Sequence, residues 1–422
     1  MNLFYNSFFI FCVAFFLRLI ASIFFGDKVL DHEFDVLVRN MINGNGYTYW
    51  TVLENGDITN KFVDNGVYYI PSAYMPILYP LCLTLLTYIF GYGDMHVFMV
   101  LLIQSLIGVI NCFMIRDIYN LKFSNNTSKI ITWIPALFPL HIFMSSQISA
   151  STLYVFLISA VILFYYKLIH KKTFKNAIIL GSLLGFLTLA RADAILLIPA
   201  ITMMLFLLHK SVEYKKIIIM VLLSIIIISP MSIRNYNHFG FFYPLTVSGG
   251  LNLWLGNNPD ATGSRENYVV PYKPIPKSIL DRVEKVAKNK NYESNVDNIY
   301  KEFAIDFIKE NPLSVIQLSL KKVIFFWVHI FDKRIQYPQL NNFLYWGPWI
   351  GLLPFFLLSI REILSNWRKH DIEIFLITYF TFVYSVFFIL PRYRLIVLPI
   401  YIIFSFYYLS QKKLEEKREH KR

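Results

Sequence analysis

Charge is scarce in this chain. Only 16% of the 422 residues are charged, whereas 56% are hydrophobic. Apolar stretches such as 215–230 and 372–390 lack the polar face, repeating at the helical period, that a helix on a soluble protein would show. Runs of this kind are typical of helices that cross a bilayer. The scarcity of charge excludes a soluble globular domain and predicts an all-α polytopic membrane protein.

Cysteine is also scarce, and histidine follows no pattern. The three cysteines, Cys12, Cys82 and Cys112, all lie in apolar segments, which indicates small buried side chains and not a disulfide framework. The nine histidines are scattered without the HxxxH spacing of a zinc site. The sequence therefore predicts no metal centre built from these two residue types.

Nucleotide-binding motifs are missing. No strand followed by GxGxxG and no GxxxxGK[ST] loop is present, and the glycines of 248–263 have the wrong spacing for either motif. A nucleotide-activated substrate is therefore not expected. A lipid-linked phosphate is the activated substrate that suits an enzyme embedded in a membrane.

Basic residues are abundant, but many of them gather in short segments. The net charge is +13, and Lys and Arg cluster in 116–129, 167–175, 209–216, 361–369 and the tail 411–422. Cytoplasmic loops of membrane proteins carry such an excess of positive charge. The distribution indicates topology and excludes nucleic acid as the partner.

Twelve apolar segments compete as membrane spans. They are 4–26, 72–92, 95–115, 130–147, 152–166, 176–190, 193–208, 216–231, 315–331, 342–360, 372–390 and 395–410. If all twelve cross, three basic loops fall outside, against the charge rule. If 72–92, with its prolines, and 315–331, with two lysines, lie along the outer surface, every short basic loop falls inside. We therefore expect about ten transmembrane helices and both termini in the cytoplasm.

This topology makes residues 1–422 a single integral membrane domain. It has a first outer loop at 27–94, a second large outer loop at 232–341 and a basic cytoplasmic tail at 411–422. The first apolar run lacks a basic region before it and a small-residue cleavage site, so it is expected to be retained as a helix.

Acidic residues gather in the first outer loop. The stretch VLDHEFD at 29–35 holds Asp31, Glu33 and Asp35, and the loop has eight acidic residues against three basic ones. The remaining candidates lie at other outer positions: Arg191, Asp193, Arg234, Arg392 and Arg394. Arginine binds phosphate through paired hydrogen bonds, and a carboxylate can take a proton from an acceptor. The candidate chemistry therefore faces one side of the membrane.

The segment from Asp31 to Tyr47 resembles the first outer loop of glycosyltransferases that use polyprenyl-phosphate sugars. These include the protein O-mannosyltransferases and the bacterial aminoarabinose transferases of lipid A. Their pattern is an acid, an aromatic residue three positions on and a helix ending in GxGY, matched here by Asp31, Phe34 and 44–47. Segments 76–91, 229–263 and 390–399 are similar to later blocks of the family, in the same order.

The resemblance implies a GT-C-like helical bundle, with juxtamembrane helices, that transfers a sugar with inversion at the outer face of a bacterial plasma membrane. A polyprenyl-phosphate sugar is the implied donor, and a protein, lipid or glycan is the acceptor. Asp31 is the implied general base. The implied substrate-binding residues are Tyr47, Asp64, Arg191, Asp193, Arg234, Arg392 and Arg394.

One position departs from the family pattern. Many members carry a second acid in the outer turn after the third span, where this chain has Ser151. This departure puts a metal-bridged site in doubt, with Asp193 or Asp64 as replacements for the acid. No cofactor is required by the pattern, and a divalent cation stays open.

Each singled-out acid also has a structural interpretation. Asp31 could cap a helix over 33–43, since Asp is a preferred N-cap residue. Glu33 and Asp35 alternate with apolar residues and are expected on a solvated face.

The basic candidates have structural alternatives too. Arg392 and Arg394 either grip the phosphate as a fork or extend to the interface as anchors. Arg234 is a phosphate ligand or a loop anchor. Lys321 and Lys322 are expected at lipid headgroups, and Arg18, inside the first span, needs a partner or a water-filled cavity.

Two other functions remain open. A lipid or sugar transporter (a flippase) would suit ten spans, but transporters place ionisable residues near the midplane and often have repeated halves. Apart from Arg18, the charged candidates gather at the outer ends of the spans, and no halves repeat. A polysaccharide polymerase would share the outward chemistry, and the sequence separates it only weakly from the proposed transferase.

Overall fold

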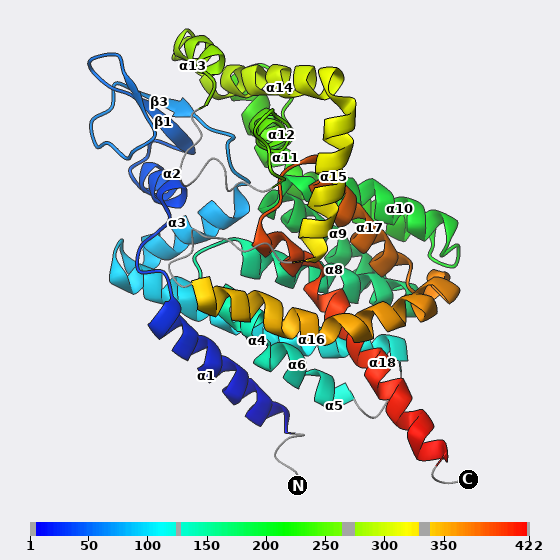
Figure 1. The fold of residues 1–422 in the computed structure, drawn as a ribbon. Helices are drawn as coiled ribbons and strands as arrows, with labels where there is room; N and C mark the ends of the chain where they lie inside the picture. Colours follow the sequence, from blue (N-terminus) through cyan, green and yellow to red (C-terminus); the bar gives the residue numbers. More distant parts are fainter. Residues whose placement is uncertain (1–5, 124–127, 264–274, 329–337, 420–422) are drawn as a thin grey trace.

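The computed structural model describes residues 6–123, 128–263, 275–328 and 338–419. Within these ranges helices dominate, and a small sheet lies at one end of the helical bundle (Figure 1). The all-α membrane architecture expected from the sequence is thus confirmed for the bundle, and the sheet is an addition to it.

Six helical segments are long and apolar enough to cross a membrane within the described residues. They are α1 (Ser7–Phe25), α4 (Asp94–Phe123), α8 (Ser151–Lys171), α11 (Tyr214–Phe239), Gly347–Ser365 of α16 (Pro338–Ser365) and Arg392–Ser410, which covers most of η5 (Pro391–Val397) and the start of α18 (Leu398–Glu419). Shorter apolar helical segments are α3 (Leu78–Phe90), α9 (Phe174–Ala190) and 192–207, which joins η2 (Ala192–Leu196) to α10 (Leu197–Leu207). The count of ten spans stays a prediction.

Glycines allow α9 and α11 to pack closely. A Cβ on Gly181 would lie 2.3 Å from the carbonyl oxygen of Met220, and one on Gly185 would lie 2.8 Å from the Ile227 side chain. The Ser224 hydroxyl donates to the Gly181 carbonyl at 2.9 Å. This spacing of small residues is the packing mode that helices use in lipid, where no hydrophobic effect drives them together.

The span expected at 130–147 is broken. It forms three short helices, α5 (Ser128–Ile131), α6 (Trp133–Leu137) and α7 (Pro139–Met144), because the residue before a proline avoids the helical conformation and Phe138 is extended. In addition, α4 continues to Phe123, so the first half of the basic loop 116–129 is helical.

Arg18 fills the gap that this break leaves. Its guanidinium is fully buried and donates to the carbonyls of Pro135 and Ala136 at 3.2 and 3.4 Å, and it lies 2.6 Å from Nδ1 of His141. Carbonyls freed from a helix inside a bilayer must find another donor. The buried partner that Arg18 requires is therefore the broken helix itself.

The first outer loop contains α2 (His32–Ile42) and a three-stranded antiparallel sheet of order β2–β1–β3. Its strands are β1 (Thr48–Val52), β2 (Ile58–Thr59) and β3 (Tyr68–Pro71), with Trp50 opposite Ile70. Gly44 and Gly46 adopt φ of 80° and 72°, which side chains disfavour, and so turn the chain from α2 into β1.

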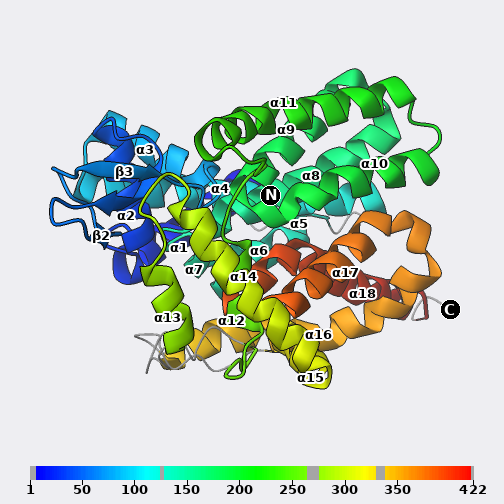
Figure 2. The same cartoon turned by 90° about the horizontal axis from the view of Figure 1, so that it is seen from above.

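In the parts that the structure describes, the second outer loop alternates helices with non-helical segments. It contains α12 (Gly249–Gly256), α13 (Lys277–Glu284), α14 (Tyr292–Glu310) and α15 (Pro312–Trp327). The helical stretch expected at 281–310 corresponds to the end of α13 and all of α14. Figure 2 shows α14 running from beside the sheet across the bundle to α15.

The four short basic loops meet at one end of the molecule. Lys122 at the end of α4 pairs with Glu373 of α17 (Asp371–Val386) at 2.6 Å and donates to the Lys369 carbonyl at 3.2 Å. Tyr166 of α8 donates to Glu373 at 2.6 Å, and His209 lies 2.7 Å from Asp371. The sheet lies at the far end in both views (Figures 1 and 2).

This grouping generates a topology prediction. We expect an impermeant maleimide to label Asn55→Cys, in the exposed β1–β2 turn, in intact cells. Lys175→Cys, exposed at the start of α9, should react only after permeabilisation. The background is the Cys12→Ser, Cys82→Ser, Cys112→Ser variant. Labelling of both positions in intact cells would refute the shared inner face. The sequence alone also predicts that a cysteine at Asn126 should not be labelled in intact cells, but this residue lies outside the described residues.

Candidate active site

A cavity of about 490 Å³ lies where the outer loops meet the bundle. Segments far apart in the chain form its walls: the start of α2, residues 74–76, the turn before α8, the turn after α9, residues 246–252 and the stretch from Val383 to Tyr393. Four sequence-predicted site residues line it, namely Asp31, Arg191, Asp193 and Arg392. Acidic and basic candidates therefore share one space.

Asp31 is both a cap and a wall residue. It precedes α2, and its Oδ1 accepts the backbone N–H of His32 at 2.8 Å. Among the described residues, no bond to its Oδ2 is found, and the side chain lines the cavity. The capping interpretation and the proposed role as a base are therefore compatible.

Glu33 and Asp35, the two acids that follow Asp31, lie in different surroundings. Glu33 lines the cavity beside Asp31 and accepts a hydrogen bond from the Tyr74 hydroxyl at 3.3 Å, contrary to the solvated face expected for it. Asp35 instead pairs with Arg39 at 3.1 Å and accepts from Tyr92. The helical turn of about 100° per residue separates the two carboxylates.

Arg191 and Asp193 form an ion pair inside a cluster of tyrosines. Nη2 and Nε of Arg191 donate to the two carboxylate oxygens at 2.9 and 3.3 Å. Tyr384 and Tyr154 also donate to Asp193, at 2.9 and 3.4 Å. The rings of Tyr154, Tyr384 and Tyr393 lie 5.0 to 5.6 Å from the guanidinium. This arrangement holds a cation rigidly at the cavity wall.

Arg392 and Arg394 do not form a fork. Arg392 is exposed and lines the cavity, whereas Arg394 is 1% exposed, donates to the Phe325 carbonyl at 3.2 Å and lies over the Trp349 ring at 5.6 Å. Both belong to the 3₁₀ helix η5, in which residues two apart point about 240° from each other. The cavity pairs Arg392 with Arg191 instead.

Arg234 and Tyr47 support the wall from behind. Arg234 donates to the carbonyls of Ser72 and Tyr47 at 2.5 and 2.8 Å, and the Tyr47 hydroxyl donates to the Met75 carbonyl at 2.8 Å. In the structure as described, neither residue lines the cavity. The anchor interpretation of Arg234 fits these contacts, and the proposed substrate contact of both residues does not.

The proposed replacements for the second acid do not fit that role. Asp64 is exposed in the loop before β3, away from the described cavity lining, and Asp193 is committed to Arg191. Ser151 lines the cavity at the position in question. Among the described residues no group of three His, Cys, Asp or Glu side chains could hold a metal ion.

Lys321 and Lys322 also differ from each other. Lys322 is fully buried and lies 3.3 Å from Oδ1 of Asn257 and 3.2 Å from the Val386 carbonyl. The headgroup contact expected for it is therefore wrong for this lysine. Lys321 lies on the more exposed side of α15.

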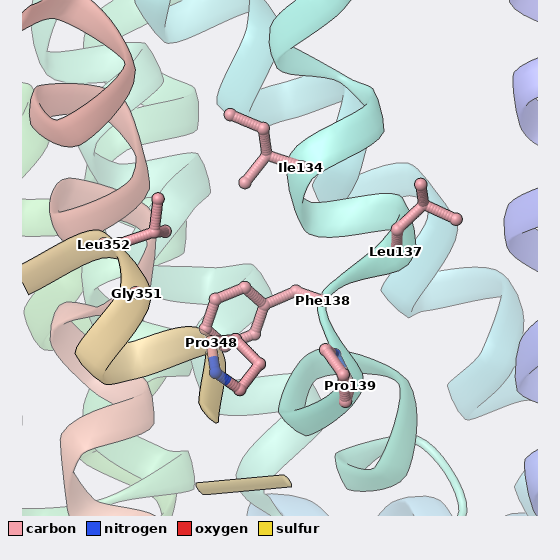
Figure 3. Close-up of a pocket in the computed structure, with 7 residues that line it drawn as sticks. All are labelled: Ile134, Leu137, Phe138, Pro139, Pro348, Gly351 and Leu352. Carbon is pink, nitrogen blue, oxygen red and sulfur yellow. The ribbon is translucent and has the colours of Figure 1, made fainter. Parts of the chain in front are cut away.

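A second hollow of about 280 Å³ lies between α6, α7 and α16 (Figure 3). Its lining is apolar: Ile134, Leu137, Phe138, Pro139, Pro348, Gly351 and Leu352. It shares no residue with the larger cavity and offers no side chain for proton transfer or phosphate binding. The larger cavity is therefore the candidate active site.

The fold is that of the GT-C glycosyltransferases. The chain is similar to the oligosaccharyltransferase AglB of Archaeoglobus fulgidus in complex with an inhibitory peptide and a dolichol-phosphate, with a TM-score of 0.57, 13% identity and coverage of 98% of this chain and 51% of that one. A structure of the oligosaccharyltransferase of the same organism, tethered with an acceptor peptide, gives a TM-score of 0.56 at 12% identity. The match covers 98% of this chain and 50% of that one. The chain thus spans about half the length of these structures.

A family match agrees with the fold. Residues 75–233 match the dolichyl-phosphate-mannose-protein mannosyltransferase family. The resemblance predicted from the sequence is therefore confirmed. ArnT from Cupriavidus metallidurans bound to undecaprenyl phosphate gives a TM-score of 0.42 at 12% identity, over 96% of this chain and 77% of that one. No curated protein matches the chain by sequence.

Sequence reasoning missed most of the cavity's polar walls. Tyr74, Tyr154, Tyr384 and Tyr393 carry no local motif, and the chain has 28 tyrosines among which to choose. The alternation of Glu33 with apolar neighbours indicated solvent, although it equally suits a residue facing a polar cavity.

The arginine arrangement generates a prediction about binding. Arg392→Ala should lower kcat/KM for a lipid-linked donor by about tenfold to a hundredfold, the range of a lost charge-assisted hydrogen bond. Because Arg392 is exposed, the melting temperature in detergent should not change. Arg394→Lys is the comparison variant. Because Arg394 is buried, this substitution should mainly lower the melting temperature. The reverse pattern would contradict this assignment of the two arginines.

Proposed function

We propose that this protein is an inverting glycosyltransferase that moves a sugar from a polyprenyl-phosphate donor to an acceptor at the outer face of the membrane. One observation carries the proposal: a carboxylate, Asp31, and two cations, Arg191 and Arg392, line a single cavity at the loop-bearing end of an apolar helical bundle. A general base and a phosphate site are the two elements that such a transfer needs.

The donor phosphate lies between Arg191 and Arg392. Arg191 uses Nε and Nη2 for Asp193, which leaves Nη1 for the phosphate, and exposed Arg392 closes the other side. The negative charge that develops on the leaving oxygen is thereby met by fixed cations, which is the form of electrostatic stabilisation that accelerates such reactions most. The lipid chain extends along the apolar exterior of the bundle.

Asp31 activates the acceptor. Its carboxylate takes the proton of the acceptor's hydroxyl or amine as that atom attacks the anomeric carbon. The new bond forms at this carbon while its bond to the phosphate oxygen breaks, and polyprenyl phosphate leaves with the electron pair. A single displacement inverts the configuration, and no covalent enzyme intermediate is required.

Support for the donor class comes from the relatives. The matched family is named for dolichyl-phosphate-mannose, and one matched archaeal structure is a complex with a dolichol-phosphate. We extend this chemistry to a polyprenyl phosphate in a bacterial plasma membrane, with the cavity on the periplasmic or external side and both termini in the cytoplasm. The acceptor is a protein, a lipid or a glycan.

A transporter is the less favoured alternative. Its ionisable residues would line a path near the midplane. In the described part of the chain, Lys122, Glu373, Asp371 and His209 are tied to one another at the end opposite the cavity. A polysaccharide polymerase shares the proposed chemistry and differs in its acceptor, a growing glycan.

The role of Asp31 generates the central prediction. Asp31→Asn retains the helix cap, because Asn caps about as well as Asp, but removes the base. Transfer from a lipid-linked donor in vitro should fall by roughly a hundredfold or more, while the detergent melting curve stays that of the parent protein.

Asp35→Asn is the matched control. Asp35 lies on the same helix, but it pairs with Arg39 outside the described cavity lining, so transfer should change little. If Asp31→Asn transfers at the parent rate, or loses activity only because it melts, the base is not Asp31. Retention of the anomeric configuration in the product would refute the single displacement.

A further inference from the structure

A buried carboxylate joins the two outer loops. Glu293, in the first turn of α14, is 6% exposed. Its Oε1 accepts the Ser72 hydroxyl at 2.6 Å and its Oε2 accepts the Ala73 N–H at 2.8 Å. Both donors are fully buried and lie in the first outer loop, 220 residues or more away along the chain.

The segment that Glu293 holds is fixed from every side. Arg234 of α11 donates to the Ser72 carbonyl, Val247 N–H donates to the Ala73 carbonyl at 2.8 Å, and the Tyr47 hydroxyl donates to the Met75 carbonyl. Glu293 accepts from the Ser72 hydroxyl and the Ala73 N–H, and the Tyr47 carbonyl accepts the Ser72 N–H at 2.9 Å. Loss of its charge therefore leaves one of the two donors, the backbone N–H or the hydroxyl, without its acceptor.

The held segment is a wall of the cavity. Tyr74, Met75 and Pro76 line it, and the Tyr74 hydroxyl reaches Glu33 beside Asp31. The Tyr74 ring also stacks on Tyr49, with centroids 5.1 Å apart and planes 4° apart. A shift of residues 72–73 would therefore move the side chain that contacts the acidic edge of the cavity.

We propose that Glu293 is a positioning residue for sugar transfer: from the second outer loop it holds residues 72–76, and through Tyr74 it sets the acidic edge of the cavity. This inference rests on the proposed function. Nothing in the sequence around Glu293 resembles an active-site motif, because its partners come from the other loop.

The charge of Glu293 changes near neutral pH. Burial raises its pKa to about 7, against the opposing effects of the Ser72 and Ala73 hydrogen bonds and of Arg234. The charged or titratable groups that face it are Arg234 from α11, Tyr47 and Tyr49 from the first outer loop, and Asp297 from α14. Only the ionised carboxylate accepts both hydrogen bonds freely, because neither of its oxygens carries a proton that itself needs an acceptor.

Two pH dependences of opposite sign follow. Transfer should rise as pH increases through about 7, when both donors gain their acceptor. The free energy of unfolding should instead fall as pH increases. The pKa is above the 4.5 of an unperturbed glutamate, so the folded state holds the proton more tightly and loses this contribution as pH rises through about 7.

The test compares kcat and KM for the lipid-linked donor between pH 6 and 8. In the parent protein we expect kcat to rise by about two- to tenfold, the range of one hydrogen bond. Glu293→Gln has a single acceptor oxygen, so its kcat at pH 8 should equal the parent's low-pH value and this step should disappear. The melting-temperature trend should disappear with it.

Two further variants move the step in opposite directions. Ser72→Ala removes a hydrogen bond that lowers the pKa, so the midpoint should move to higher pH. Asp297→Asn removes a nearby negative charge that raises the pKa, so the midpoint should move to lower pH. Asp297 also binds the N–H groups of Gly250 and Leu251, which makes it a control for general weakening of α14. A purely structural loss would shift neither midpoint in this manner.

Amide hydrogen exchange tests the anchor without any transfer assay. In Glu293→Gln, peptides that cover residues 72–75 should exchange faster than in the parent at the same pH, whereas β1 should not change. Unchanged exchange at 72–75, or a pH step that survives in Glu293→Gln, would overturn the proposal. If the parent transfers no sugar while 72–75 loses protection, the proposed function fails and the anchor stands.

Discussion

The hydrocarbon core of a bilayer offers no water to a backbone amide, and this constraint underlies the whole structure. Every N–H and C=O in the core must be satisfied within the protein, so the chain crosses as helices. Where the helix over 130–147 breaks at Pro139, the freed carbonyls of Pro135 and Ala136 are met by a buried arginine from α1. Arg18 is thus explained by backbone hydrogen bonding and not by catalysis.

The constraint ends at the loop-bearing end, and the polar chemistry begins there. The start of α2, residues 74–76, the start of α12 and the turns between helices assemble a cavity whose walls come from six segments. Rigid aromatic rings surround Arg191, and its partner Asp193 is itself fixed by two tyrosines. Arg191 is thereby preorganised for the phosphate contact that we propose, because its guanidinium has few other orientations available.

The opposite end shows a different use of charge. Lys122 and Glu373 are almost fully buried and bound to each other and to Tyr166. A buried pair of this kind adds little net stability beyond a well-packed apolar alternative, but removal of one partner is costly. It joins α4, α8 and α17, and the positive loops around it gather on one face. The division between an acidic, aromatic cavity and a basic rim agrees with a directed orientation in the membrane.

By itself the sequence determined the class of fold, the clustering of basic loops at one end and the cap at Asp31, and it singled out Asp31, Arg191, Asp193 and Arg392, which line one cavity. Composition, charge and short motifs are local properties, and a bilayer converts them directly into helices and sidedness. The family resemblance also came from local motifs.

Tertiary structure alone decided which polar residues face the cavity. Arg394 points away from Arg392 because η5 is a 3₁₀ helix, and Arg234 is occupied by the carbonyls of Ser72 and Tyr47. Glu293 acquires its role from Ser72 and Ala73, which lie more than two hundred residues earlier in the chain. Contacts between such distant segments depend on how the helices and loops pack, and no pattern within a short window of residues records them.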